Sequence, residues 1–130
     1  MIMQSNPSYE VKIFIGSKRG YNGESFSKED LLKEISDFQI YWEIQYSNTV
    51  SLRVSNTTYV VKDYVEDGFE ITAINYPRFP KQPKEITDFM RALVARLLLK
   101  LEQNRISMTF SSNGITEMYE SNKAEQTHKP

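Results

Sequence analysis

The residues best suited to bind a ligand lie in one short stretch, 74–84, which precedes a long predicted helix. The stretch reads Ile-Asn-Tyr-Pro-Arg-Phe-Pro-Lys-Gln-Pro-Lys and holds three cations and two aromatic rings. Its prolines restrict the backbone, so Arg78 and Phe79 would lose little entropy on binding. An arginine beside an aromatic ring suits a base plus a phosphate, because the ring stacks and the guanidinium binds anionic oxygens. The alternative is that Tyr76 and Phe79 only cover the core.

The amino-acid composition narrows the chemistry that this chain can do. A chain of 130 residues fits one domain and buries roughly two-thirds of its unfolded surface. It contains no cysteine, which agrees with a reducing cytoplasm and excludes thiol catalysis and thiolate metal sites. Its one histidine, His128, lies in the polar tail, which argues against a histidine triad or a multi-histidine metal site. We therefore expect no metal and no cofactor.

The charge balance bears on the partners. Sixteen basic and seventeen acidic residues give a net charge of −1, too balanced for a protein that grips long nucleic acid. A small anion held by a local cluster stays open. The N-terminus lacks a secretion signal and no apolar run is long enough to span lipid, so we expect a soluble protein of the bacterial host cytoplasm without a membrane partner.

The pattern of apolar residues predicts one α+β domain, in which an antiparallel sheet is packed by two helices, the longer one near the C-terminus. A strand is expected at 9–15, followed by a glycine-rich loop at 17–26. Ser27 is expected to cap a helix that buries Leu31, Leu32, Ile35 and Phe38. Further strands are expected at 41–46, 50–54, 59–65 and 69–74, with turns at 55–58 and at Asp67-Gly68.

The second helix is the clearest structural prediction. Apolar residues recur with helical spacing over about five turns; they are Ile86, Phe89, Met90, Leu93, Val94, Leu97, Leu98 and Leu101. Ala92, Ala95 and Leu99 form another, small-residue side that suggests a subunit contact. A strand at 105–111, the hairpin signal Asn113-Gly114 and a return strand at 115–119 follow. We expect a flexible N-terminus at 1–8, the domain at 9–120 and a disordered tail at 121–130.

Acidic residues offer the main route to an enzyme. Asp63, Glu66, Asp67 and Glu70 lie close together, but around an apparent turn between strands, where solvated acids are normal. The standard phosphate-binding and nucleophile motifs are absent from the sequence. These observations favour binding over catalysis, and we expect a protein that is not an enzyme.

Three segments resemble the phage Thoeris anti-defence protein 1 family. They are Val11–Gly16 leading into Lys18–Tyr21, the Ile74–Pro80 loop before a long helix, and Arg105–Phe110 after it. The resemblance covers about residues 9 to 119. Its most specific motif is Asn-Tyr-Pro-Arg-Phe-Pro.

This resemblance implies a sponge. Members of that family bind a cyclic ADP-ribose isomer (gcADPR) made by bacterial TIR-domain proteins and sequester it uncleaved, so that Thoeris antiphage defence is not activated. The resemblance also implies a homo-oligomer, either a dimer or a hexamer built from dimers. Some members additionally hold cyclic oligonucleotides at separate sites.

Carried onto this chain, the resemblance assigns eight ligand-binding residues. Phe79 would stack on adenine, Arg105 would cover its other face or contact phosphate, Arg78, Lys18 and Arg19 would bind the pyrophosphate, and Asn75, Asp88 and Arg91 would reach ribose hydroxyls or the adenine edge. Simpler explanations stay open. Lys18 and Arg19 fit solvated loop cations, and Asp88 and Arg91 fit an ion pair on a helix surface.

Three other functions compete with the sponge. A phosphodiesterase would need a metal or an acid–base pair, which the sequence does not clearly offer. A nucleic-acid-binding module would need a basic stripe. A small protein-interaction module would use the Ala92, Ala95 and Leu99 side of the helix and ignore nucleotides.

Overall fold

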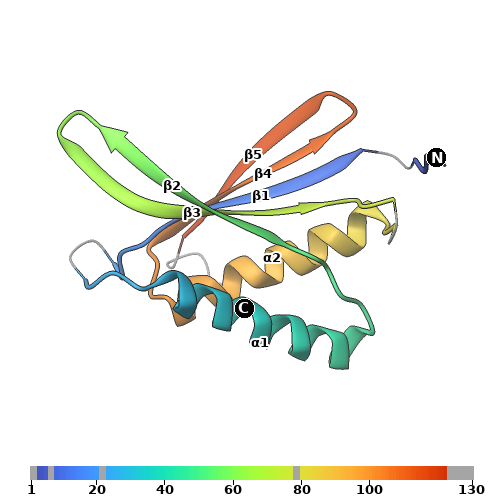
Figure 1. Ribbon diagram of the computed structural model, residues 1–130, viewed down its shortest axis with the longest axis horizontal. Coiled ribbons are helices and arrows are strands. Elements are labelled where there is room, and N and C mark those ends of the chain that lie inside the picture. The colour runs from blue at the N-terminus through green and yellow to red at the C-terminus, as the bar shows by residue number, and fades with distance from the viewer. Residues whose placement is uncertain (1–2, 6–7, 21–22, 78–79, 123–130) are drawn as a thin grey trace.

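The chain folds into a five-stranded sheet with two helices. The computed structural model describes residues 3–5, 8–20, 23–77 and 80–122. Its elements are β1 (Tyr9–Gly16), α1 (Lys28–Tyr46), β2 (Arg53–Val61), β3 (Tyr64–Ile74), α2 (Pro83–Lys100), β4 (Arg105–Ser112) and β5 (Ile115–Asn122). The strand order is β2-β3-β1-β4-β5, and every neighbouring pair is antiparallel. Both helices lie on the same side of the sheet (Figure 1), which confirms the predicted α+β class.

The core lies between this inner face of the sheet and the helices. Val11 and Ile13 of β1 are fully buried, as are Phe89 and Leu93 of α2. Burial of the whole predicted apolar stripe, from Ile86 to Leu101, confirms the second helix. Burying a leucine or phenylalanine side chain contributes about 1.5–3 kcal/mol, so this stripe is a main source of stability.

The polar ends of both helices follow from the local sequence. Ser27 accepts a hydrogen bond from the backbone of Asp30, and the Asp30 carboxylate accepts one from the Ser27 backbone, which confirms the expected cap. These bonds lower the pKa of Asp30. At α2 the Glu85 carboxylate accepts a hydrogen bond from the Gln82 backbone, the Glu85 backbone donates to the Gln82 carbonyl, and a proline lies in the first turn.

Residues 41–46 are helical, so the strand predicted there is wrong. They form the last part of α1, which ends where Ser47 adopts a left-handed φ of 52°. The alternation of Trp42, Ile44 and Tyr46 suggested a strand, but the aromatic residues also follow helical spacing. The Trp42 ring lies 5.5 Å from Phe38 and 4.3 Å from Tyr46, whereas Ile44 is 74% exposed. Helical packing of rings four residues apart therefore decides this segment.

This extension makes the two helices nearly equal in length, at 19 residues for α1 and 18 for α2. Leu32, expected in the buried stripe of α1, is 42% exposed. None of the helices in the described ranges is both long and apolar enough to cross a membrane.

The two turns predicted at 55–58 and at Asp67-Gly68 are also wrong. Residues 55–58 continue β2, which begins at Arg53 rather than at Val50. These residues are polar because β2 lies at the edge of the sheet. They still form a strand, since threonine favours extended backbone. The chain turns instead between Val61 and Tyr64, with Lys62 at a φ of 57°. By contrast, Asn113 and Gly114 form the predicted turn, with φ values of 52° and 79°.

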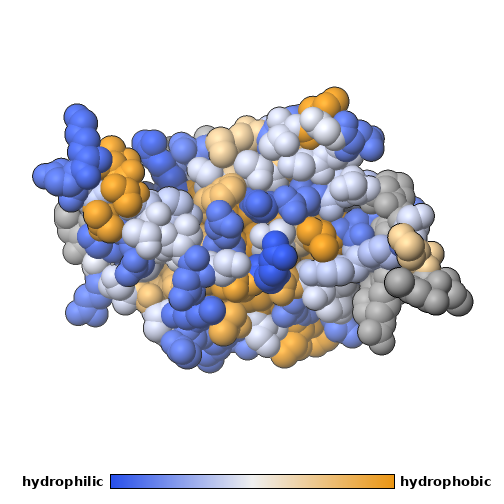
Figure 2. Space-filling model, turned by 45° about the horizontal axis from the view of Figure 1, so that its top comes forward, coloured by the Kyte–Doolittle hydropathy of each residue, from blue (hydrophilic) through white to orange (hydrophobic). Residues whose placement is uncertain are grey.

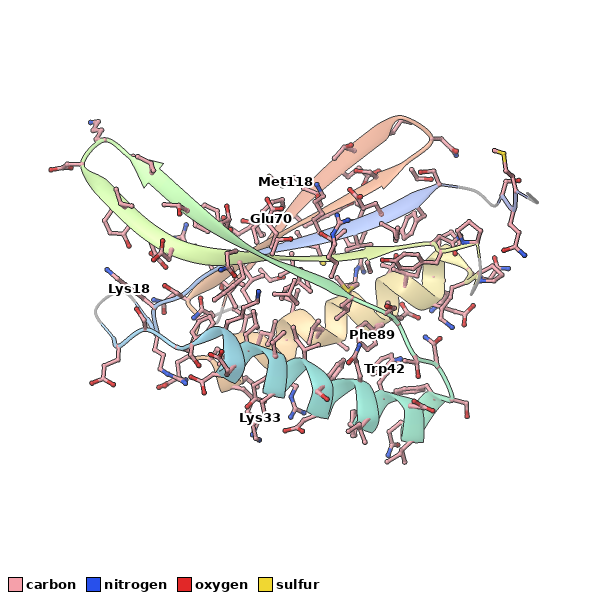
Figure 3. The ribbon with its side chains drawn as sticks, in the orientation of Figure 1. Lys18, Lys33, Trp42, Glu70, Phe89 and Met118 are labelled. Carbon is pink, nitrogen blue, oxygen red and sulfur yellow. The ribbon has the colours of Figure 1, made fainter. Side chains whose placement is uncertain are left out.

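The outer face of the sheet, opposite the helices, is mostly polar. Figure 3 shows Glu70 and Met118 on this face, and Trp42 and Phe89 on the helix side. Figure 2 shows the surface that includes it, where hydrophilic side chains predominate and apolar ones gather at the end of the β2–β3 hairpin. The exposed apolar residues at that end are Val60, Val61, Tyr64 and Val65. Of the tail predicted at 121–130, residues 121 and 122 belong to β5, and residues 123–130 lie outside the described residues.

Candidate functional site

Two glycines face each other across neighbouring strands and leave a bare patch on the outer face. Gly16 of β1 is paired with Gly68 of β3. A Cβ atom at Gly68 would come within 2.5 Å of the Tyr59 ring, and one at Gly16 would come within 2.0 Å of the Glu66 carboxylate. The glycines therefore allow the ring and the carboxylate to lie directly against the backbone of the sheet.

A hollow of about 230 Å³ opens beside this patch. We call it the Tyr59 pocket. Its walls come from the outer face and from the loops that follow β1 and precede β4. It is lined by Gly16, Lys18, Gly20, Tyr59, Glu66, Gln103, Asn104 and Arg105.

Tyr59 keeps its proton at neutral pH. Burial raises the pKa of Tyr59 to about 12, and the negative charges of Glu70 and Glu66 contribute to the same shift. Its hydroxyl donates a long hydrogen bond of 3.4 Å to the carbonyl of Phe69. The phenol is thus a neutral donor that lies over the backbone of the sheet, with a long bond to Phe69 and a further bond to the Ile15 backbone.

Glu66 is held in place from two sides. Its carboxylate accepts hydrogen bonds from the Tyr64 hydroxyl and, at 3.5 Å, from the backbone of Lys18. The first of these bonds raises the pKa of Tyr64. The Lys18 ammonium lies 5.4 Å from the centre of the Tyr64 ring. An acid, a cation and two phenols are thereby fixed relative to one another at one end of the sheet.

The pocket also contains a second cation. Arg105 lines it and lies 3.5 Å from the Glu120 carboxylate, with its side chain 63% exposed. Gln103 is buried and donates hydrogen bonds to the carbonyls of Lys18 and Leu101, so it holds the loop in shape. The pocket therefore presents charges of both signs around an uncharged phenol.

The structure brings only part of the predicted ligand-binding set together. Lys18 and Arg105 share the Tyr59 pocket. Arg19 instead binds the carbonyl of Lys100 at 3.3 Å and the carboxylate of Glu102 at 3.5 Å, which ties its loop to the end of α2.

The other predicted residues lie elsewhere. Asn75 accepts a bond from the Lys81 backbone at 2.8 Å and shapes the loop before α2. Asp88 pairs with Lys84 rather than with Arg91, whose guanidinium lies 5.6 Å from the Phe110 ring centre. The assignments of Arg78 and Phe79 fall outside the described residues.

Sequence reasoning missed Tyr59 and undervalued the acids. The sequence predicts solvated acids at Glu66 and Glu70 because it predicts a turn at Asp67-Gly68. With Gly68 inside β3, the spacing of two places Glu66, Gly68 and Glu70 on one face of a single strand. That spacing was the signal in the sequence, and β2 pairs Tyr59 directly with Glu66.

The fold is shared with a phage protein. No family model matches the chain, and no curated protein matches it. Among solved structures, an apo phage SAM lyase has a TM-score of 0.68 at 17% identity, with 94% of each chain covered. A phage SAM lyase in complex with S-methyl-5'-thioadenosine has a TM-score of 0.66 at 16% identity, covering 94% of this chain and 95% of the other.

This likeness corrects the predicted function. Both of these solved structures are of a phage SAM lyase, so the expectation of a sponge that holds a cyclic ADP-ribose isomer uncleaved is wrong, together with its link to Thoeris defence. The expectation that the chain is not an enzyme is contradicted by the same finding. The neighbours come from phage, as does the Thoeris anti-defence family, but they are not members of that family. The expected dimer or hexamer and the expected absence of a long nucleic-acid partner stay predictions.

Proposed function

We propose that the protein is a lyase that cleaves S-adenosylmethionine (SAM) and releases S-methyl-5'-thioadenosine. The observation that carries this proposal is the Tyr59 pocket, where a neutral phenol lies with a carboxylate on a bare glycine patch. The nearly full-length likeness to a phage SAM lyase supports the choice of substrate. The expected location in the bacterial host cytoplasm, where SAM is made, is part of the proposal.

The charges of the pocket are complementary to those of SAM. This substrate carries a sulfonium cation, an ammonium group and a carboxylate. Glu66 and the nearby Glu70 attract the two cations, and the Tyr59 ring offers a π face to the sulfonium. Lys18 and Arg105 are available to the substrate carboxylate. A hollow of about 230 Å³ is smaller than a usual site of roughly 300–1,000 Å³, so the nucleoside would extend beyond it along the sheet.

The bond that is cleaved can be inferred from the proposed product, S-methyl-5'-thioadenosine. Cleavage of the bond between sulfur and Cγ gives neutral S-methyl-5'-thioadenosine, with the electron pair of that bond on sulfur. No water is added, so we propose that the substrate's own carboxylate attacks Cγ and closes a lactone. One C–S bond breaks, one C–O bond forms and no proton moves. The protein then needs to fold the substrate into the reacting geometry, and the Tyr59 hydroxyl can donate a hydrogen bond there without ionising.

The experiment is to incubate the purified chain with SAM in ¹⁸O-labelled water and analyse the products by mass spectrometry. The proposal predicts S-methyl-5'-thioadenosine and an unlabelled lactone at the earliest times. Homoserine carrying ¹⁸O from the start would mean hydrolysis, and an unsaturated amino acid would mean elimination by a base. SAM that remains intact would contradict the proposal altogether.

A further inference from the structure

A groove lies on the opposite side of the sheet from the Tyr59 pocket, between α2 and the inner face of the β4–β5 hairpin. Its hollow measures about 390 Å³ and is lined by Tyr9, Thr87, Arg91, Phe110 and Tyr119 among others. A second hollow of about 430 Å³ continues it along α2 and shares the last three of these residues. We call the two together the Arg91 groove. It exists because β5, at the edge of the sheet, is left uncovered by the helices.

Arg91 is poised in this groove without a carboxylate partner. Its side chain is exposed, and among the described residues none of the ion pairs involves it. The acids that line the groove, and the one beside Arg91 on α2, are engaged otherwise. Glu117 accepts from the Tyr119 hydroxyl, Glu120 pairs with Arg105, and Asp88 pairs with Lys84. The guanidinium lies over the Phe110 ring, which holds it without consuming its hydrogen-bond donors.

Aromatic rings form the rest of the wall. Phe110 and Tyr119 meet edge to face with their centres 5.3 Å apart. Tyr9 is hydrogen bonded to Thr87 of α2, which fixes the opposite side of the groove. A guanidinium held over a ring at this distance keeps a flat face for a second ring and its N–H edge for anionic oxygens.

We propose that the Arg91 groove binds a planar aromatic anion, a flat ring that carries a phosphate or a carboxylate. The ring lies against Arg91 and the aromatic wall, and the anionic group is bound by the guanidinium. The Glu117 carboxylate lies on the same wall and repels a second negative charge. The site therefore favours ligands with one compact anionic group, held at Arg91. This site is independent of the proposed lyase reaction, because the sheet separates it from the Tyr59 pocket.

Calorimetric titration of the full chain tests the proposal with three probes. Adenosine 5'-monophosphate and indole-3-acetate represent the phosphate and carboxylate forms, and adenosine is the uncharged analogue of the first. We expect at least one anion to bind about tenfold more tightly than adenosine. Binding of the phosphate probe alone or the carboxylate probe alone would identify which anionic group the site accepts. Equal affinity for all three probes, or no binding by either anion, would overturn the proposal.

Variants locate the binding. Arg91→Gln, at an exposed side chain, should weaken the better anion about tenfold and leave the melting temperature unchanged. Arg53→Gln is the matched control, because Arg53 is an exposed arginine on the outer face and should have no effect. Phe110→Leu should weaken the same anion while keeping the groove apolar. Unchanged affinity in Arg91→Gln, or an equal loss in Arg53→Gln, would contradict the site.

Discussion

The β2–β3 and β4–β5 hairpins flank the same sheet, yet the two sites beside them differ in charge and in face. Beside β2–β3, the Tyr59 pocket opens on the outer face and places one acid, Glu66, and two cations, Lys18 and Arg105, around a neutral phenol. Beside β4–β5, the Arg91 groove opens on the helix side and places one arginine among rings. The first site forms because two glycines leave space on the outer face, and the second forms because neither helix covers β5. Chemistry on this fold is therefore set locally, by small departures from regular packing.

The largest effect should come from Tyr59→Phe. The change removes the hydroxyl and keeps the ring, so we expect SAM cleavage to fall by about 100-fold, because the substrate is no longer held in the reacting geometry. Tyr41→Phe on the exposed side of α1 is the control and should keep full activity. Product formation under single-turnover conditions measures both. Equal rates for the two variants would remove Tyr59 from the reaction.

The glycine patch should separate stability from activity. Gly68→Ala would push against the Tyr59 ring and the carbonyl of Ile15, each 2.5 Å from the new Cβ atom, so we expect a loss of about 1–3 kcal/mol in the free energy of unfolding. Gly16→Ala meets only the end of the Glu66 side chain, which can swing away. It should therefore lower activity with a smaller loss of stability. Denaturant unfolding of both variants gives the comparison, which fails if Gly16→Ala is the less stable one.

Lys18→Met should act on substrate affinity. The ammonium is assigned to the substrate carboxylate, so its removal should raise KM about fivefold to tenfold with a smaller change in kcat. Arg19→Met in the same loop is the control, because Arg19 binds the end of α2 and does not line the pocket. A fall in kcat with unchanged KM would assign Lys18 a different role.

The smallest effect concerns alkaline pH. Tyr59 has a pKa of about 12 in the folded chain against an ordinary value of 10.0, so between these values the unfolded chain loses the proton that the folded chain keeps. The folded state binds more protons in that window, and stability therefore falls as pH rises through it. Below that window the shift has no effect on the pH dependence. The free energy of unfolding, measured across this pH window, should fall less steeply in Tyr59→Phe than in the parent chain. Identical slopes would contradict the pKa shift.

The sequence predicted the parts of the fold that depend on local pattern. The long stripe of α2, the Ser27 cap and the Asn113-Gly114 turn each carry their own signal within a few residues. The prediction failed where the conformation of a residue depends on a contact with another element of the fold. Asp67-Gly68 indicated a turn from its residue types alone. The reason for a glycine there is the close contact with Tyr59, which arises only when β2 and β3 pair. Trp42 is a different case, because the helical spacing of Phe38, Trp42 and Tyr46 is itself local and competes with the alternation that predicts a strand.

The candidate site was hidden for the same reason. Lys18 and Arg105 were identified as cations suited to a ligand, and the structure places both in the Tyr59 pocket. The acids that accompany them become neighbours of Tyr59 only when β2 pairs with β3. The turn predicted at Asp67-Gly68 interrupts β3, so the sequence did not predict this pairing. Without Tyr59 and the acids, a set of cations and rings pointed to an anionic ligand and away from catalysis.

The most direct test of the Tyr59 pocket is an NMR titration of the ¹⁵N-labelled chain with S-methyl-5'-thioadenosine. The backbone amides of Gly16 and Gly68 lie beneath the pocket and are good reporters, because neither residue has a side chain to move. The account predicts saturable shifts at these two amides and at Glu66, with no change at Arg91 or Phe110. Shifts confined to the Arg91 groove, or none at all, would contradict the placement of the reaction in the Tyr59 pocket.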